Sequence, residues 1–288
     1  MNQNTPAIDS LSPAEMSQKA AAISVKKVGL DTVSMFLLAF LAGAYIALGA
    51  VFATTIATGG SALPYGVNKL LTGLVFSLGL ILVVVGGAEL FTGNNLLIIG
   101  YFSRKISLRG MLRNWSVVYL GNFVGSLTIA ALMFFAREYT LANGAVGLTA
   151  LNIGIAKTSL GFVQAIALGI LCNILVCLAV WLTFSARTTG DKILAIIAPI
   201  TAFVAAGFEH SVANMYFVPM ALFIKNSQDI TFFSQIGQVP ADFPSLTWGN
   251  FLVSNLLPVT IGNIIGGAGL VGALYWLIYL RNSHQTEI

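Results

Sequence analysis

Long apolar segments fill most of this 288-residue chain, and short polar loops separate them. A straight helix crosses the hydrocarbon core of a bilayer with about 20 apolar residues, and only helices or closed barrels satisfy their backbone hydrogen bonds within lipid. Charged residues make up 8% of the chain, whereas they make up about 25% of an average soluble domain. The chain is therefore predicted to be an all-α membrane protein with six transmembrane helices. The apolar segments comprise residues 32–57, 69–102, 115–136, 157–185, 193–225 and 248–280.

The second and fifth apolar segments are longer than one crossing requires, and each contains a polar interruption. Both interruptions read G-x-E-x-x-x-x-N, at residues 87–94 and 207–214. Acidic residues and helix-breaking glycines are costly in lipid, so they normally face a protein interior or a water-filled path. Each segment is interpreted as one broken crossing, and a re-entrant pair of half-crossings is the alternative.

The distribution of Lys and Arg favours single crossings, because short cytoplasmic loops collect basic residues. With six crossings, the basic N-terminal segment, the loops at 104–113 and 187–192, and Arg281 all fall on one side. If the second segment crossed twice, the loop at 104–113 would lie opposite the N-terminal segment. Both termini are therefore predicted to be cytoplasmic. The net charge of +4 then reflects orientation in the membrane and not binding of nucleic acid.

The sequence is predicted to form one membrane domain with short flanking segments. Ser12 and Glu15 have the spacing of a helix capping box, with Pro13 at the first helical position, which predicts a short surface helix there. The expected parts are a cytoplasmic N-terminal segment at residues 1–28, a transmembrane channel domain at 29–281 and a cytoplasmic tail at 282–288.

A second repeated motif indicates that the membrane domain consists of two related halves. The pattern G-N-x-x-G occurs at residues 121–125 in the third segment and at 262–266 in the sixth. Because each half has three crossings, the second half enters the membrane in the opposite orientation. Inverted repeats with broken helices commonly hold a solute site near the bilayer midplane. The sequence thus predicts an inverted 3+3 repeat with a permeation path between the second and fifth helices.

The two helix breaks favour a small anion as the solute. A broken helix exposes backbone N–H groups and partial positive charge at the start of its second half. Thr92 and Ser211 follow the breaks, where their hydroxyl groups can donate hydrogen bonds. Glu89 and Glu209 are expected to point away from the pore and to accept hydrogen bonds from loop amides.

His210 and Lys157 are the ionisable candidates along this path. His210 is the only histidine within an apolar segment, since His284 lies in the polar tail. Imidazole can donate a hydrogen bond or exchange a proton near physiological pH, and intramembrane ionisable groups are usually functional. Lys157, near the outer end of the fourth segment, is expected to attract an anion, although an ordinary snorkelling lysine is the alternative.

Apolar residues beside the breaks are expected to form constrictions that resist hydrated ions, although ordinary helix packing would give the same pattern. These residues are Phe76, Leu80, Leu90, Phe91, Val176 and Phe203.

No metal site, cofactor or enzymatic activity is predicted. Cys172 and Cys177 lie in an apolar segment without a nearby His or Asp, which favours inert packing. An intramembrane enzyme that uses Glu209 and His210 would lack further metal ligands and a nucleophile motif. A channel for neutral solutes would not need His210 and Lys157.

Taken together, these stretches resemble the formate/nitrite transporter family. The resemblance extends from about residue 30 to residue 280, and its most specific stretch is 207–214, G-F-E-H-S-V-A-N. It implies an aquaporin-like protomer in a homopentamer of a bacterial inner membrane, with one pore in each subunit. The other stretches that carry it are residues 87–94, 121–122, 173–181 and 258–263.

The resemblance also implies roles for individual residues. His210 corresponds to the central pore histidine, Thr92 to the polar residue of the broken second helix, and Asn173 to a pore-lining amide. Lys157 corresponds to the basic residue of the periplasmic vestibule, and the apolar residues above correspond to the constrictions. Structural support of the broken helices is expected from Glu89, Glu209, Asn94, Asn214, Asn122 and Asn263.

Members of this family transport formate, nitrite or hydrosulfide. Residues 179–181, 187–192 and 258–261 resemble the formate branch, whereas residues 93–94 and 156–159 are closer to the nitrite branch. Formate is therefore predicted, with nitrite or hydrosulfide as the alternative. An apolar path makes the charged form of a weak acid costly. The solute is thus expected to cross as the neutral acid, with a proton from water or from His210.

Overall fold

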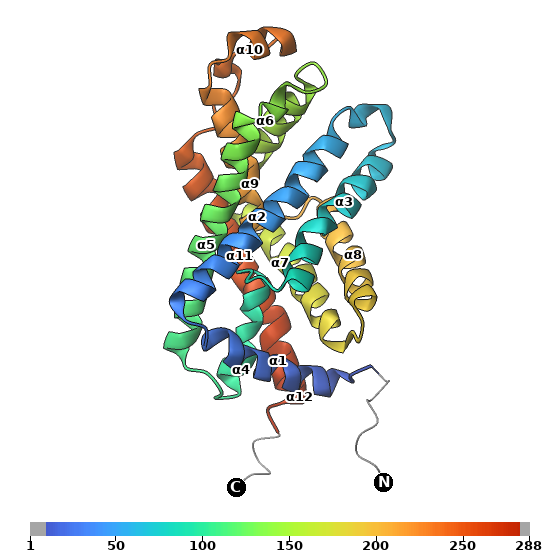
Figure 1. Cartoon of the computed structure of the whole chain (residues 1–288), viewed down its shortest axis with the longest axis vertical. Coiled ribbons are helices and arrows are strands. Elements are labelled where there is room, and N and C mark those ends of the chain that lie inside the picture. Colours follow the sequence, from blue (N-terminus) through green and yellow to red (C-terminus); the bar gives the residue numbers. More distant parts are fainter. Residues whose placement is uncertain (1–9, 283–288) are drawn as a thin grey trace.

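All regular secondary structure in residues 10–282, the part of the chain that this computed structural model describes, is helical (Figure 1). The longer elements are α1 Pro13–Val28, α2 Thr32–Ala57, α3 Tyr65–Gly86, α4 Leu97–Phe102, α5 Leu108–Phe135, α6 Ala145–Thr158, α7 Phe162–Ser185, α8 Thr189–Ala205, α9 Ser211–Asn226 and α10 Ile230–Ile236. The short 3-10 turns are η1 Gly60–Ala62, η2 Gly93–Leu96, η3 Glu138–Thr140 and η4 Pro240–Asp242.

The last helix of the described chain is continuous from Asn250 to Tyr279 but changes its winding along its length. Its elements are the π-helical stretch η5 Asn250–Leu256, the α-helix α11 Leu257–Ile264, the π-helical stretch η6 Ile265–Ala273 and the α-helix α12 Leu274–Tyr279. α12, the last helix element of the described chain, lies near α1 at one end of the molecule (Figure 1).

Five helices of the described chain are long and apolar enough to cross a membrane. They are α2, α3, α5, α7 and the helix Asn250–Tyr279. The helices α8 and α9 have 17 and 16 residues, so each is shorter than the roughly 20 residues of a full crossing. The protein is therefore a multi-pass, all-helical membrane protein.

Local sequence explains where several helices begin. Ser12 and Glu15 form the capping box that starts α1, with the Ser12 hydroxyl accepting from the Glu15 backbone N–H and the Glu15 carboxylate accepting from that of Ser12. Thr188 and Asp191 form a second capping box at α8. The Asp31 carboxylate accepts backbone N–H groups at the start of α2. Such caps satisfy N–H groups that a helix start otherwise leaves unpaired.

Two glycines in left-handed conformations end the helices before the polar interruptions. Gly87 follows α3 with φ of +81°, and Gly207 follows α8 with φ of +74°. A residue with a Cβ atom is strained at these angles, so glycine allows the chain to leave the helix there. After each glycine the chain runs without helix until Thr92 in one half and until His210 in the other.

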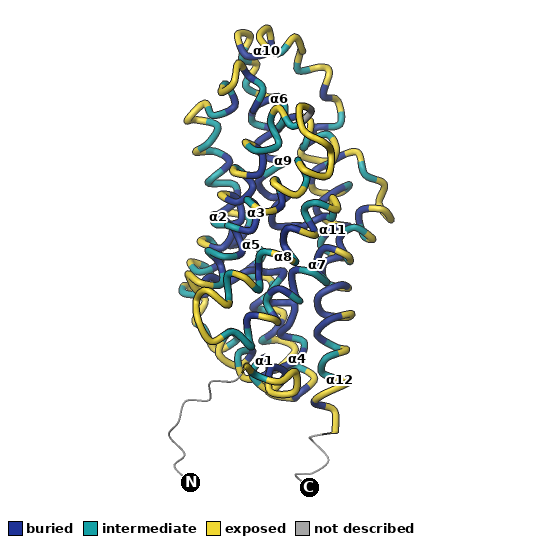
Figure 2. Tube along the Cα trace, turned by 90° about the vertical axis from the view of Figure 1, so that its right-hand side faces the viewer, coloured by how far each residue is buried: buried dark blue, intermediate teal, exposed yellow. Residues whose placement is uncertain are grey.

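The long helices pack in an elongated bundle. α2 packs against α3 and α5, α3 packs against α8, and α7 packs against α8 and α11. The short helix α9 lies against α5 and α6 near the middle of the bundle, where most of its residues are buried (Figure 2). α1 lies across one end of the bundle, and α10 lies at the opposite end (Figure 1).

One boundary differs from that expected from hydropathy. The apolar segment expected at 157–185 belongs to two helices, because α6 ends at Thr158 and α7 begins after Gly161. Lys157 therefore lies in the last turn of α6 and not at the start of the following long helix.

The surface helix expected near the N-terminus is α1, and its Met16, Ala20 and Ala21 are buried against neighbouring helices. The predicted tail, which includes His284, lies outside the described residues apart from Asn282.

Candidate functional site

Two buried asparagines hold the interrupted backbone segments in the same way. The Asn122 amide nitrogen donates to the backbone carbonyl of Glu89 over 2.9 Å, and its oxygen accepts from the Phe91 N–H over 2.9 Å. The Asn263 amide donates to the Glu209 carbonyl over 3.0 Å and accepts from the Ser211 N–H over 2.9 Å. Backbone groups that lack helical partners are thereby satisfied by side chains, as buried polar groups require.

Each glutamate carboxylate accepts hydrogen bonds from an asparagine and a lysine. Lys27 Nζ lies 2.7 Å from Glu89 Oε1, and Asn94 donates to Glu89 Oε2 over 2.7 Å. In the other half, Lys157 Nζ lies 2.9 Å from Glu209 Oε1, and Asn214 donates to Glu209 Oε2 over 2.7 Å.

A further asparagine completes each of these networks. Asn114 accepts from Asn94 over 2.9 Å, and Asn255 accepts from Asn214 over 2.8 Å. Asn255 also donates to the backbone carbonyl of Lys157 over 3.0 Å. Burying a charged pair is costly, and satisfying its remaining polar atoms in this way offsets part of that cost.

The glutamate partners differ from those expected from the sequence. The carboxylates were expected to accept loop amides, but among the described residues they accept hydrogen bonds from the Lys and Asn side chains. The loop backbone is instead held by Asn122 and Asn263. The physical reason is that a buried carboxylate is best compensated by a positive charge, which a neutral amide does not supply.

Sequence analysis missed Lys27, Asn114 and Asn255. Asn114 precedes Asn122 by the same number of residues as Asn255 precedes Asn263, so a longer repeat search would have detected this pair. Lys27 lies 62 residues before Glu89, whereas Lys157 lies 52 residues before Glu209. Because these two separations differ, Lys27 and Lys157 do not occupy equivalent positions in a repeat with one constant spacing.

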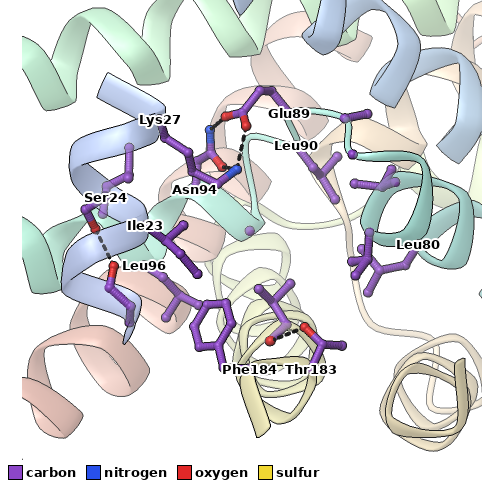
Figure 3. Close-up of a pocket in the computed structure, with 18 residues that line it drawn as sticks. Ile23, Ser24, Lys27, Leu80, Glu89, Leu90, Asn94, Leu96, Thr183 and Phe184 are labelled. Carbon is purple, nitrogen blue, oxygen red and sulfur yellow. Dashed lines mark hydrogen bonds and ion pairs between the residues drawn. The ribbon is translucent and has the colours of Figure 1, made fainter. Parts of the chain in front are cut away.

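Two cavities open beside these networks. The Lys27 cavity has a volume of about 290 Å³ and is lined by residues of α1, α3, α4 and α7 and of the first interruption. Figure 3 shows Lys27 reaching from α1 toward Glu89 and Asn94, with Leu80 on the opposite wall. The Lys157 cavity, also about 290 Å³, is lined by residues of α2, α3, α6, α7, α8 and α9 and of the second interruption.

Thr92 and His210 join the two interruptions. Thr92 Oγ1 lies 3.0 Å from His210 Nε2, and both residues are buried. His210 Nδ1 accepts the backbone N–H of Ala213 over 3.0 Å, which caps the start of α9. Nδ1 must therefore be unprotonated, so the proton of a neutral imidazole is on Nε2 and points to Thr92. Protonation of Nδ1 would require this cap to break.

The expected constriction residues are divided between the two cavities. Leu80 and Leu90 line the Lys27 cavity, whereas Phe76 and Phe203 line the Lys157 cavity together with His210. Phe76 and Phe203 form an edge contact with ring centroids 5.6 Å apart, and Phe203 stacks on His210 at 5.9 Å.

The remaining expected pore residues line neither cavity. Phe91 and Val176 are buried and line neither cavity. Ser211 is also buried, and its hydroxyl has no hydrogen-bond partner among the described residues. Asn173 lines neither cavity, and its amide donates to the backbone carbonyls of Thr92 and Asn263. Asn173 thus supports the junction of the two halves in this structure.

Residues 10–282 contain no group of three or more His, Cys, Asp or Glu residues that could hold a metal ion. Cys172 and Cys177 are buried as free thiols within α7. Cys177 donates to the backbone carbonyl of Thr92 over 3.3 Å, which places it in the packing behind the first interruption.

Comparison with known proteins reveals extensive similarity. The family model described as "Formate/nitrite transporter" matches residues 14–277. The chain is 45% identical over 278 residues to "Formate channel FocA" of Escherichia coli (strain K12), with 96% of this chain and 98% of the relative covered. It is 44% identical to "Formate channel FocA" of Haemophilus influenzae (strain ATCC 51907 / DSM 11121 / KW20 / Rd), with 95% and 96% covered.

A solved structure agrees with the sequence relatives. The structure described as "Pentameric formate channel with formate bound" superposes with a TM-score of 0.83 and 49% sequence identity. The match covers 87% of this chain and 98% of that chain. These similar proteins are channels and not enzymes.

Proposed function

The chain belongs to the formate/nitrite transporter family, and we propose that it is a membrane channel that carries formate together with a proton. The proposed path leads from one cavity to the other past Thr92 and His210. The observation that carries this proposal is the contact between Thr92 and His210, which lies where the two interruptions meet between the cavities. The similarity to proteins named formate channels supports formate as the substrate.

The proposed topology has six crossings in an inverted 3+3 repeat. α8 and α9, with 17 and 16 residues, are each shorter than one full crossing, so we treat them as the two halves of a single crossing that is broken at the interruption between them. The matching networks around Asn122 and Asn263 support two related halves. In this topology α3 with α4, and α8 with α9, are the broken second and fifth helices.

The Lys27 cavity is proposed to face the cytoplasm of a bacterial inner membrane. α1 and α4 lie at one end of the molecule, and the basic loop between α4 and α5 follows them (Figure 1). That loop carries Arg104 and Lys105, and basic residues accumulate on the cytoplasmic side of membrane proteins. The domain division at residues 1–28, 29–281 and 282–288 follows from the same orientation.

We propose a homopentamer in the lipid bilayer, with a separate pore in each subunit. The similar solved structure is described as pentameric. Large apolar residues such as Phe135 and Val163 are exposed along the long helices and would contact lipid or a neighbouring subunit. No cofactor, metal or nucleic acid has a role in this proposal.

The proposed mechanism begins with attraction of the anion by Lys157 or Lys27. The anion then loses water as it enters the apolar waist near Phe76, Leu80, Leu90 and Phe203, where the charged form becomes costly. The Nε2–H of His210 and the Thr92 hydroxyl supply hydrogen bonds at the centre. Since His210 is neutral with its single proton on Nε2, the proton that accompanies formate is assigned to water.

Replacing His210 tests this mechanism through the pH dependence of flux. In proteoliposomes, His210→Ala is expected to reduce formate flux by about tenfold or more at neutral pH, because one hydrogen bond to a charged solute contributes roughly 1.5–3 kcal/mol. At mildly acidic pH the loss is expected to be smaller, because more of the solute enters as the neutral acid. His210→Gln retains an N–H donor and serves as the matched variant. Equal flux of wild type and His210→Ala at both pH values would contradict the central role of His210.

Substrate preference requires a separate comparison of anions. Uptake of formate, nitrite and hydrosulfide by the wild-type protein is to be measured side by side at acidic and neutral pH. Formate is expected to give the highest flux, in agreement with the relatives named formate channels. Higher flux of nitrite at both pH values would assign the chain to the alternative substrate that residues 93–94 and 156–159 suggest.

A further inference from the structure

We propose that Lys69 forms an anion-capture subsite at the mouth of the Lys157 cavity, which binds a small monovalent anion before it reaches Lys157. This inference rests on the proposed anion transport. It assigns the initial attraction on this side mainly to Lys69, and so revises the first step of the proposed mechanism, in which the sequence and the family resemblance pointed to Lys157.

The charges that line the Lys157 cavity do not balance. Its charged lining residues are Lys69, Lys157 and Glu209. Lys157 and Glu209 form an ion pair at 2.9 Å, so their charges largely cancel for an anion that approaches from a distance. None of the ion pairs within residues 10–282 includes Lys69. Lys69 therefore supplies the uncompensated positive charge of this cavity.

The position of Lys69 suits an entry site. It lies at the start of the second turn of α3, and its side chain is partly buried at the cavity lining. Its Nζ lies 5.5 Å from the centre of the Tyr65 ring, and Tyr65 is 77% exposed. A cation held over an exposed aromatic ring keeps part of its hydration and remains available to an anion. Phe76, two turns further along α3, lines the same cavity.

Carboxylates at this end of the molecule do not neutralise Lys69. Glu138, Asp229 and Asp242 lie in the connections around α6 and α10, and none of them lines the Lys157 cavity. Asp229 pairs with Arg137 at 3.0 Å, and Asp242 accepts the backbone N–H of Val239 over 2.8 Å. Glu209 is the one carboxylate among the described lining residues, and it is paired with Lys157, so an anion at the cavity mouth meets Lys69 without an unpaired carboxylate beside it.

The Lys27 cavity lacks a corresponding third charge. Its charged lining residues are Lys27 and Glu89, which pair at 2.7 Å. The two entrances therefore differ by one positive charge, although the networks around the glutamates match. Capture of a dilute anion is consequently expected to be more effective from the side of the Lys157 cavity.

The test is a concentration series of formate uptake in vesicles of known protein orientation. At low ionic strength, Lys69→Gln is expected to raise the apparent KM for formate about three- to tenfold from the Lys157 side, with the maximal flux retained. From the Lys27 side the KM is expected to remain unchanged. The difference in KM between the wild type and Lys69→Gln is expected to shrink at high salt, because salt screens exposed charges. Lys69→Arg is expected to behave as the wild type.

Lys225→Gln is the matched control for surface charge. Lys225 lies in the last turn of α9, donates to the Leu246 carbonyl over 2.8 Å and does not line the cavity. An unchanged KM in Lys69→Gln, while the wild type transports formate, would overturn the capture site. An equal rise of the KM in Lys225→Gln would also overturn the capture site, since general surface charge would then explain the effect of Lys69→Gln. If the wild type passes neither formate nor nitrite, the proposed function fails, and the capture site loses its premise.

Discussion

Lys157→Met is expected to destabilise the folded protein by about 3–5 kcal/mol, because removal of one partner of a buried ion pair leaves the other charge uncompensated. The Lys157 side chain is 14% exposed, and the carboxylate of Glu209 is buried with it. Methionine retains a similar length and apolar character, so the substitution removes mainly the charge. Thermal unfolding in detergent measures the loss. The double variant Lys157→Met/Glu209→Met is expected to recover most of it.

The matched control is the exposed ion pair between Arg137 and Asp229. Arg137 is 62% exposed, and such pairs contribute only about 0–1 kcal/mol. The pKa of Asp229 lies below its usual value chiefly because the Phe232 backbone N–H donates to its carboxylate, and Arg137 contributes less. Arg137→Met is therefore expected to unfold close to the wild-type temperature. If Lys157→Met lowered the unfolding temperature as little as Arg137→Met does, the buried ion pair would not stabilise the fold as described.

Asn263→Leu is expected to cost about 3 kcal/mol or more and to abolish most flux. This side chain donates to the carbonyls of Glu209 and Gly169 and accepts the N–H of Ser211. Each buried polar group left without a partner costs roughly 1–3 kcal/mol. The interruption beside His210 would lose its support, so the geometry of the Thr92–His210 contact would be lost as well. Thermal unfolding and formate uptake in proteoliposomes measure the two effects.

Asn250→Leu provides the control for an asparagine in the same long helix. Asn250 lies at the start of η5, is only partly buried and donates to the carbonyl of Ser245. Its replacement leaves no interruption unsupported, so it is expected to change stability by about 1 kcal/mol and to retain flux. Asn122→Leu is expected to resemble Asn263→Leu, because its contacts in the other half are equivalent. Wild-type stability of Asn263→Leu would contradict the supporting role of both asparagines.

Much of the fold was predictable because it depends on local properties of the chain. Apolar length indicated α2, α3, α5, α7 and the helix Asn250–Tyr279, which the structure describes as helices long enough to cross a membrane. The capping box of Ser12 and Glu15 predicted the start of α1. The boundary between α6 and α7 was not predicted, because the fourth apolar segment was expected to begin at Lys157, which lies in the last turn of α6.

The site was predictable in its residue types and less so in its contacts. The motif pointed to Glu89 and Glu209, but their lysine partners lie 62 and 52 residues away in the chain. Asn173 was expected in the pore from the family resemblance, but the resemblance did not indicate that its amide nitrogen donates to the Thr92 and Asn263 carbonyls. Residue type limits what a side chain can bind, but packing determines which partner it reaches.

The sequence by itself determined the class of protein, since only helices with few charges suit lipid along so much of the chain. It also determined the positions at which polar residues enter the apolar segments. Only the tertiary structure decided that Thr92 meets His210 across 118 residues, that the His210 proton lies on Nε2, and that Lys27 compensates Glu89. The physical reason is that hydropathy and capping act within a few residues, whereas these contacts depend on how separate helices pack.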